Sequence, residues 1–439
     1  MVQHRNPSRA QMFEEMTSRW SPFPNTDKTL GAYDYFSQTI RLNSVDGAKL
    51  KAALEQHDFP ARLEVIPLLT HEMQHFVDHT ASIWGRDLLV RLFDVYAVRQ
   101  QGALAEFWRI PEMMRELKTV HYSDYYTEYS DLAFEPWDGK RWWYQFSTGV
   151  QLDANGRENE GRPIVFTRFG RNEDEAYICR VPFSVASLLE VRAEAAAIMS
   201  AIALFKSAGD DPVRKIDQNN WYNRLNGIFY DATMTLYTVA AHCFANRLKT
   251  TEGIETYNKA SHVAWLCLNL PRRFFPSLSI PKSFSRWGPR NEALRANADR
   301  GYLYLALIEN GRDLDTRDMD GWLDEALCRS SLPPLADVLR TVEEERDAAD
   351  GQIARNPYRK RLEDVLHLGR EYARQENHAT GKIFLLESGP VPPLLLSDNQ
   401  FAGLNGLPNT GTFADPGEWY DSAFLLYERL REFIDACIV

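Results

Sequence analysis

Cysteine is rare in this sequence, and its five cysteines show no pairing pattern. Their number is odd, their spacings are wide, and none belongs to a Cys-x-x-Cys pair. This pattern argues against a disulfide framework and against a cysteine-based zinc site. The chain also begins without an apolar segment, so we expect no secretory signal. A protein of the reducing cytoplasm is therefore expected.

Basic runs and long apolar runs are missing as well. Asp and Glu outnumber Lys and Arg by 61 to 50, which gives a formal net charge of -11 that is spread along the chain. Without a basic run, we expect neither a nucleic-acid partner nor an anionic-membrane partner. No stretch of about 18 apolar residues is present, so no membrane span is expected. With 44% hydrophobic residues, the chain can build a large globular core.

The order of the predicted elements indicates an α+β fold in which helices predominate. A strand is expected at 33–43, and three strands of a small twisted antiparallel sheet are expected at 141–183, separated by turns rich in Asn and Asp. The remaining predicted helices lie at 47–57, 87–100, 187–205, 223–248 and 418–435. We expect the chemistry in residues 1–250 and a helical C-terminal region of unknown role in residues 251–439.

The segment 67–84 contains the pattern His-Glu-x-x-His, formed by His71, Glu72 and His75. We expect one helix here, with Pro67 in its first turn and Gly85 as its stop. On that helix the two imidazoles lie one turn and about 40° apart, so both can bind one cation. Glu72 lies about 100° away and can take a proton from a water on the metal.

A third histidine on the same helix, His79, is too distant to join this site. It would lie about 12 Å along the helix axis from His71. A zinc–nitrogen bond measures about 2 Å, so one ion cannot bind both side chains. We expect His79 to be a residue of the surrounding cleft or an ordinary hydrogen-bonded side chain.

The best candidates for a third ligand are Glu190 and Glu194, which lie one turn apart in an apolar predicted helix. A catalytic zinc requires three protein ligands and an open position. Burying a carboxylate is costly unless it is paired or binds a metal. The alternative is a partly exposed helix edge with Arg192 facing solvent.

Together, His71-Glu72-x-x-His75 and Leu189-Glu190-x-x-Ala193-Glu194 resemble the gluzincin branch of the zincin metallopeptidases. The resemblance implies a zincin-like core in which Glu190 is the third ligand, with Glu194 as a neighbouring carboxylate or as the ligand itself. It also implies a sheet beside the motif helix, whose edge strand pairs with an extended peptide. The expected edge strands are 162–169 and 175–182. The possible proton donors to the oxyanion are Tyr222, Tyr230, Tyr237 and His242.

The leading hypothesis from the sequence is a zinc-dependent hydrolase that acts on a peptide or protein, with Glu72 as the catalytic base. Two alternatives stay open. The same His/His/Glu set suits Fe2+, as in a peptide-modifying oxygenase. The chain could also be a binding protein with an inactive zincin core. Nothing in the sequence indicates the oligomeric state.

Overall fold

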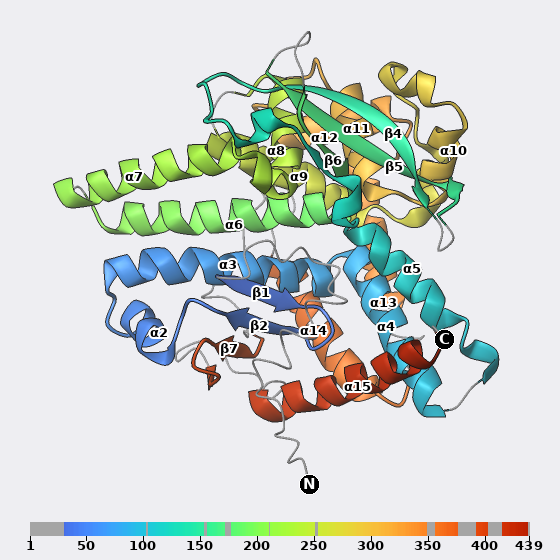
Figure 1. The fold of residues 1–439 in the computed structure, drawn as a ribbon, viewed down its shortest axis with the longest axis horizontal. Coiled ribbons are helices and arrows are strands. Elements are labelled where there is room, and N and C mark those ends of the chain that lie inside the picture. Colours follow the sequence, from blue (N-terminus) through green and yellow to red (C-terminus); the bar gives the residue numbers. More distant parts are fainter. Residues whose placement is uncertain are drawn as a thin grey trace.

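Helices predominate in the computed structural model of the protein, and two small sheets lie on opposite sides of a central pair of helices (Figure 1). The structure describes residues 30–101, 104–152, 156–171, 177–209, 211–250, 253–348, 356–375, 392–402 and 415–437. The expected mainly helical α+β class is confirmed. Within the described ranges, no helix has the length and apolar character needed to cross a membrane.

The first sheet has the order β1-β2-β7-β8, and β1 is one of its edges. Its strands are Gly31–Asp34, Thr39–Leu42, Leu394–Leu396 and Phe401–Ala402. β1 and β2 are antiparallel, whereas β2 and β7 are parallel. The expectation of a single strand at 33–43 is therefore wrong. The Asp34 carboxylate accepts hydrogen bonds from the backbone N–H groups of Phe36 and Ser37, which closes a turn between the two strands.

The second sheet is antiparallel and has the order β3-β6-β5-β4. Its strands are Glu128–Tyr129, Tyr177–Phe183, Glu158–Gly170 and Trp143–Leu152. The three strands expected at 141–183 are confirmed, while most of the expected turn residues lie outside the described residues. The expected edge strands are wrong, because β5 lies between β4 and β6, and β6 lies between β5 and β3.

Two long helices, α3 (Phe59–Ala81) and α6 (Val185–Ser207), pack along each other at the centre of the molecule (Figure 1). The carboxylate of Asp58 caps α3 by accepting a hydrogen bond from the backbone N–H of Ala61 at 3.2 Å. Ser184 and Ser187 form a capping box at the start of α6. The helix expected at 187–205 is confirmed.

The motif helix extends from residue 59 to residue 81, so both of its expected ends are wrong. Pro67 lies inside α3 and has no backbone N–H, so the Leu63 carbonyl loses its helical donor. Both residues line a cavity. Ser82 ends the helix, because its hydroxyl donates to the Asp78 carbonyl and accepts from the Gly85 N–H. Gly85 belongs to the next helix, α4 (Ile83–Gln101). A Cβ there would lie 2.4 Å from the Asp78 carbonyl oxygen.

The helix expected at 223–248 is wrong, since two helices meet in this segment. α7 covers Pro212–Phe229 and α8 covers Thr235–Leu248, with a 3-10 turn between them. The Asp231 side chain accepts a hydrogen bond from the Thr233 backbone N–H and starts that turn. Asp is a common cap at such a position, but no Gly or Pro marks the break at 230–234 in the sequence.

The other helices surround the central pair. They are α2 (Gly47–Leu54), α5 (Arg109–Val120), α9 (Gly253–Asn269), α10 (Pro289–Ala296), α11 (Arg300–Asn310), α12 (Met319–Arg329), α13 (Leu335–Ala348), α14 (Arg359–Gln375) and α15 (Pro416–Cys437). The helices expected at 47–57, 87–100 and 418–435 correspond to α2, α4 and α15.

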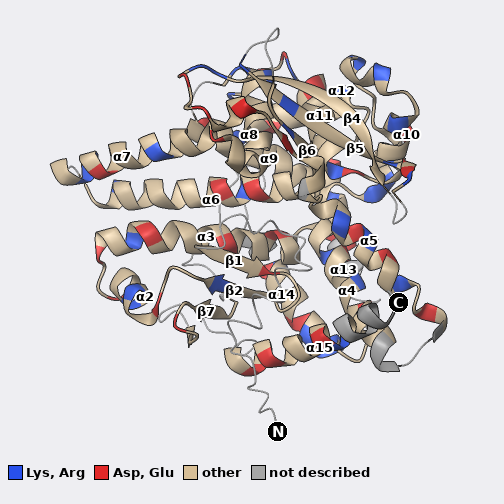
Figure 2. Ribbon diagram, viewed as in Figure 1, with Lys and Arg blue, Asp and Glu red and all other residues tan. Residues whose placement is uncertain are grey.

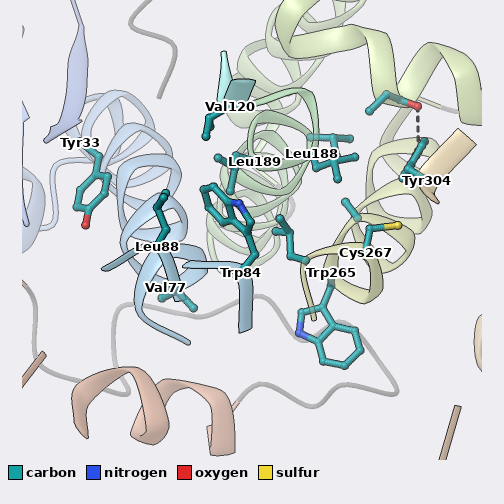
Figure 3. Packing of buried hydrophobic residues seen from close by; sticks show 14 of the residues in the cluster. Tyr33, Val77, Trp84, Leu88, Val120, Leu188, Leu189, Trp265, Cys267 and Tyr304 are labelled. Carbon is teal, nitrogen blue, oxygen red and sulfur yellow. Dashed lines mark hydrogen bonds between the residues drawn. The ribbon is translucent and has the colours of Figure 1, made fainter. Parts of the chain in front are cut away.

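A single large hydrophobic core joins these elements. Buried side chains from α4, α6 and α9, including Trp84, Leu189 and Trp265, gather between the helices (Figure 3). The hydroxyl of Tyr304 on α11 donates a hydrogen bond of 3.0 Å to the Ala240 carbonyl on α8. Basic and acidic residues are interspersed over the described part of the chain (Figure 2). This agrees with the even charge distribution of the sequence.

Candidate metal centre

The packing of α3 against α6 brings four titratable side chains of the motif segments together. His71 and His75 project from consecutive turns of α3, with their ring centroids 4.9 Å apart. Glu190 and Glu194 project from consecutive turns of α6. Both helices are capped and embedded in the core, so these side chains are held on rigid elements.

His71, His75 and Glu190 converge closely enough to hold one metal ion, with one donor atom of each within 4.8 Å of the others. The two Glu190 carboxylate oxygens lie 3.4 Å from Nε2 of His71 and 3.4 Å from Nε2 of His75. Ligand atoms that share a tetrahedral zinc, with bonds of about 2.0–2.1 Å, lie about 3.3 Å apart. The spacing between the carboxylate oxygens and the two imidazoles is therefore compatible with a shared metal ion with bonds of this length.

Glu194 has a different position from Glu190. Its Oε1 lies 3.4 Å from Nδ1 of His71, on the side of the imidazole opposite to the nitrogen that faces Glu190. A carboxylate in this position can orient the imidazole and fix its tautomer. The side chain of Glu190 is fully buried, whereas that of Glu194 is 21% exposed.

The cluster strongly attracts positive charge. Burial opposes the charge on His71, but Glu190, Glu194 and Glu72 outweigh it and raise the pKa of His71 to about 9. Burial raises the pKa of Glu190, but the neighbouring His75 and His71 lower it well below the usual value of 4.5. An arrangement that holds a proton so firmly on an imidazole is also suited to a divalent cation.

Glu72 is buried beside the two histidines, and β1 determines its environment. Burial raises the pKa of Glu72, while His71, His75 and a backbone hydrogen bond from Tyr33 oppose the rise. A Cβ at Gly31 would lie 3.1 Å from Glu72 Oε1. The absence of a side chain at residue 31 therefore leaves room for this carboxylate. A raised pKa suits a carboxylate that takes up and releases a proton near neutral pH.

A buried ion pair links the two helices next to the candidate metal ligands. Arg192 Nε donates a hydrogen bond of 2.7 Å to Asp78 Oδ1, and Gln74 donates to the same oxygen at 3.0 Å. Arg192 also donates to the Ser261 carbonyl on α9 at 3.4 Å. The alternative in which Arg192 faces solvent is wrong, because only 5% of this residue is exposed. No motif in the sequence indicates this pair, although Asp78 lies on the polar face of α3.

The candidate centre opens into a cavity of about 590 Å³, a size typical of ligand sites. Its wall is formed by β1, α2, α3, α6 and α7 and by residues 234–237. His71, Glu72, His75 and Glu194 line it, together with apolar side chains such as Leu68. Sequence reasoning missed the contributions of Gly31 and of α7, because neither carries a recognisable chemical motif.

Of the four predicted proton donors, only Tyr237 lines this cavity, and its ring centroid is 6.1 Å from that of His71. Tyr222 accepts a hydrogen bond from Gln218 on the same helix. Tyr230 stacks on Trp137. Tyr237 is therefore the candidate that the geometry favours.

Two histidines of the chain have other surroundings. His242 lies in an aromatic core cluster with its Nε2 2.5 Å from the Phe229 carbonyl, and burial lowers its pKa to about 3. His79 is buried, and its Nδ1 lies 2.7 Å from the Tyr33 hydroxyl. Neither side chain lines the cavity. This agrees with the expectation that His79 does not join His71 at a metal.

The strand beside the motif helix is β1, which packs against α3. The expected edge strands of the second sheet, β5 and β6, contribute no residue to the cavity. β1 is itself an edge strand, and Leu30 and Gly31 at its start line the cavity. The sequence placed the wrong sheet beside the site, because periodicity reveals strands but not which helix they pack against.

No family model, no curated protein and no solved structure matches this chain. The functional interpretation therefore depends on the geometry of the site.

Proposed function

We propose that the chain is a zinc-dependent hydrolase with a zincin-like core that cleaves peptide bonds. One observation carries the proposal. Each of two imidazoles on α3 has its Nε2 3.4 Å from an oxygen of one buried carboxylate on α6, and Glu72 lines the adjoining cavity. In this proposal His71, His75 and Glu190 hold the metal, and Glu194 orients His71.

The bound zinc would supply Lewis-acid chemistry, polarising a substrate carbonyl and acidifying a water. Glu72 is the general base that takes a proton from the attacking water and delivers it to the leaving amine. Its burial and raised pKa support this role. Tyr237, which lines the cavity, donates a hydrogen bond to the oxygen on which negative charge develops.

The shape of the site supports a peptide substrate. Leu30 and Gly31 bring the start of an edge strand into the cavity, and an extended peptide can pair with such an edge. A cavity of about 590 Å³ with a largely apolar wall can hold several peptide side chains.

The direct test is Glu72→Gln, assayed on a library of quenched fluorescent peptides and by metal analysis. We expect zinc to stay bound at one ion per chain while the hydrolysis rate falls by a factor of about 10²–10⁴, the usual contribution of a general base. Glu112→Gln, at an exposed position on α5, is the matched control and should behave as the parent. Parent-like hydrolysis by Glu72→Gln would refute the assigned base.

Metal analysis of anaerobically purified protein tests the choice of metal. Stoichiometric zinc supports the proposal. Stoichiometric iron would favour the oxygenase alternative on the same His/His/Glu set. Failure to bind any divalent metal would favour a binding protein without catalysis.

A further inference from the structure

The lining residues of the cavity extend from the candidate metal centre along α3 and α7. On α3 its wall extends from His75 and His71 to Leu63, and on α7 it extends from Ile228 to Asp217. At 1.5 Å per residue, Leu63 lies about 12 Å along α3 from His71, and the lining stretch of α7 is about 16 Å long. α3, α6 and α7 extend side by side toward the same end of the molecule, where α6 turns into α7 (Figure 1).

At this outer end, four side chains connect all three helices. The Phe59 ring at the start of α3 lies 5.7 Å from the Phe205 ring of α6, which lies 6.0 Å from Trp221 of α7. The Arg214 guanidinium of α7 lies 4.1 Å from the centre of the Phe59 ring. We call these four residues the aromatic clamp. Trp221 itself lines the cavity. The other three clamp residues lie beyond the last lining residues of their helices, which are Leu63 of α3, Ile198 of α6 and Asp217 of α7.

Between the metal centre and the clamp, the wall is mostly apolar. Leu68 of α3, Ile198 of α6, Leu225 and Ile228 of α7, and Met234 all line this section. Among the charged lining residues of this section, Lys49 pairs with Glu64 and Asp217 pairs with Arg214, while Arg224 is exposed to solvent. This section of the cavity therefore favours apolar side chains over charged ones.

We propose that the aromatic clamp closes the substrate groove and limits it to a short apolar chain end of about four residues. An extended peptide advances about 3.3 Å per residue, so about 12–16 Å holds about four residues. The enzyme would then cleave peptide bonds within about four residues of a chain end and would not cleave bonds in the interior of a long chain. This inference rests on the proposed function and specifies its substrate class.

Peptide hydroxamates of one to eight apolar residues provide the test, because the hydroxamate anchors one end at the metal without any need for hydrolysis. One series carries the hydroxamate at the C-terminus and the other at the N-terminus. In one of the two series, we expect the affinity for the zinc-loaded protein to rise up to about four residues. It should fall by at least about tenfold for longer chains. Equal affinity of four- and eight-residue chains in both series, or no binding at all, would overturn the proposal.

Clamp variants identify the cause of the limit. Trp221→Ala and Arg214→Ala should each restore the affinity for eight-residue chains to within about threefold of that for four-residue chains. Ile216→Ala, which changes a residue of α7 that is 61% exposed, should keep the limit. If both clamp variants keep it too, the clamp is not its origin.

The same peptides without the hydroxamate distinguish this inference from the proposed function. If the hydroxamate series shows the limit but no peptide is cleaved, the groove is correctly described and the hydrolase assignment fails. If peptides with six residues on both sides of the cut are cleaved as fast as short ones, the hydrolase assignment stands and the length limit fails.

Discussion

The ion pair between Asp78 and Arg192 should control how the two halves of the candidate metal centre meet. Asp78 follows His75 by three residues on α3, and Arg192 follows Glu190 by two residues on α6. The side chains of the pair are only 2% and 6% exposed, and 2.7 Å separates their bonded atoms. A slip of α6 along α3 would change this distance and the distances from Glu190 to both imidazoles together.

The expected loss of unfolding free energy follows from the burial of the pair. Removing one member of a buried ion pair typically costs about 3–5 kcal/mol, because the remaining charge is poorly compensated. Asp78→Asn and Arg192→Met should therefore each lower the free energy of unfolding by about 3 kcal/mol. The double variant should lose less than the sum, with a coupling energy of about 2–3 kcal/mol. Zinc affinity should fall by a factor of about 10–100 in each single variant.

Denaturant unfolding of the metal-free variants measures the coupling, and competition with a chromophoric chelator measures zinc affinity. The visible spectrum of the Co2+-loaded protein reports whether four-coordinate geometry survives. Arg359→Met, in an ion pair whose side chains are 54% and 43% exposed, is the control and should cost at most about 1 kcal/mol. A coupling energy below about 0.5 kcal/mol, or unchanged zinc affinity in both single variants, would refute the reasoning.

Three further variants and one control test the packing around the candidate centre and the titration of a buried histidine. A Cβ at Gly369 of α14 would lie 1.9 Å from the Thr80 carbonyl oxygen of α3, so Gly369→Ala should lower the unfolding free energy by about 3 kcal/mol. Gly227→Ala, where a Cβ meets nothing within 4 Å, is the control and should stabilise α7 by up to about 1 kcal/mol. Equal denaturation midpoints for the Gly369→Ala and Gly227→Ala variants would contradict this contrast. Gly31→Ala should displace the Glu72 carboxylate and reduce kcat by about tenfold or more at unchanged zinc affinity. An unchanged kcat would show that the added Cβ does not displace the carboxylate. The pKa of His242 is lowered to about 3, so the unfolded chain binds the extra proton below pH 6.5 and stability is lost as the pH falls from 6.5 to 3. The loss should reach about 5 kcal/mol at most, and His242→Gln should flatten this part of the stability profile measured by thermal unfolding.

Local patterns in the sequence predicted much of the site. The one-turn spacing of His71 and His75 requires only that the segment be helical, which the apolar stripe of the same segment indicates. The same reasoning identified Glu190 and Glu194 as carboxylates in an apolar helix. It could not choose between them, because the choice depends on the rotation of α6 relative to α3. In the structure, Glu190 faces Nε2 of both histidines and Glu194 faces Nδ1 of His71.

Long-range contacts account for most of the errors in the predicted fold. Pro67 and Gly85 appeared to mark helix ends, yet Pro67 lies at a cavity wall and Gly85 lies where α4 turns tightly against α3. Both residues are placed by their surroundings and not by the local propensity of the chain. The sheet beside α3 was unpredictable for a similar reason, since β2 pairs with β7 from more than 350 residues later in the chain.

That distant pairing also explains what the C-terminal region contributes to the metal centre. β7 pairs with β2, and β2 pairs with β1, the strand that leaves room for Glu72. α14 packs on α3 at Gly369, and α9 packs on α6 and receives a hydrogen bond from Arg192. Each of the three elements that shape the centre, β1, α3 and α6, is thus supported by residues beyond 250. The spacing of the candidate ligands in the first half of the chain therefore depends on packing that the second half supplies. Substitutions in the second half that weaken this packing should lower the metal affinity and the free energy of unfolding together.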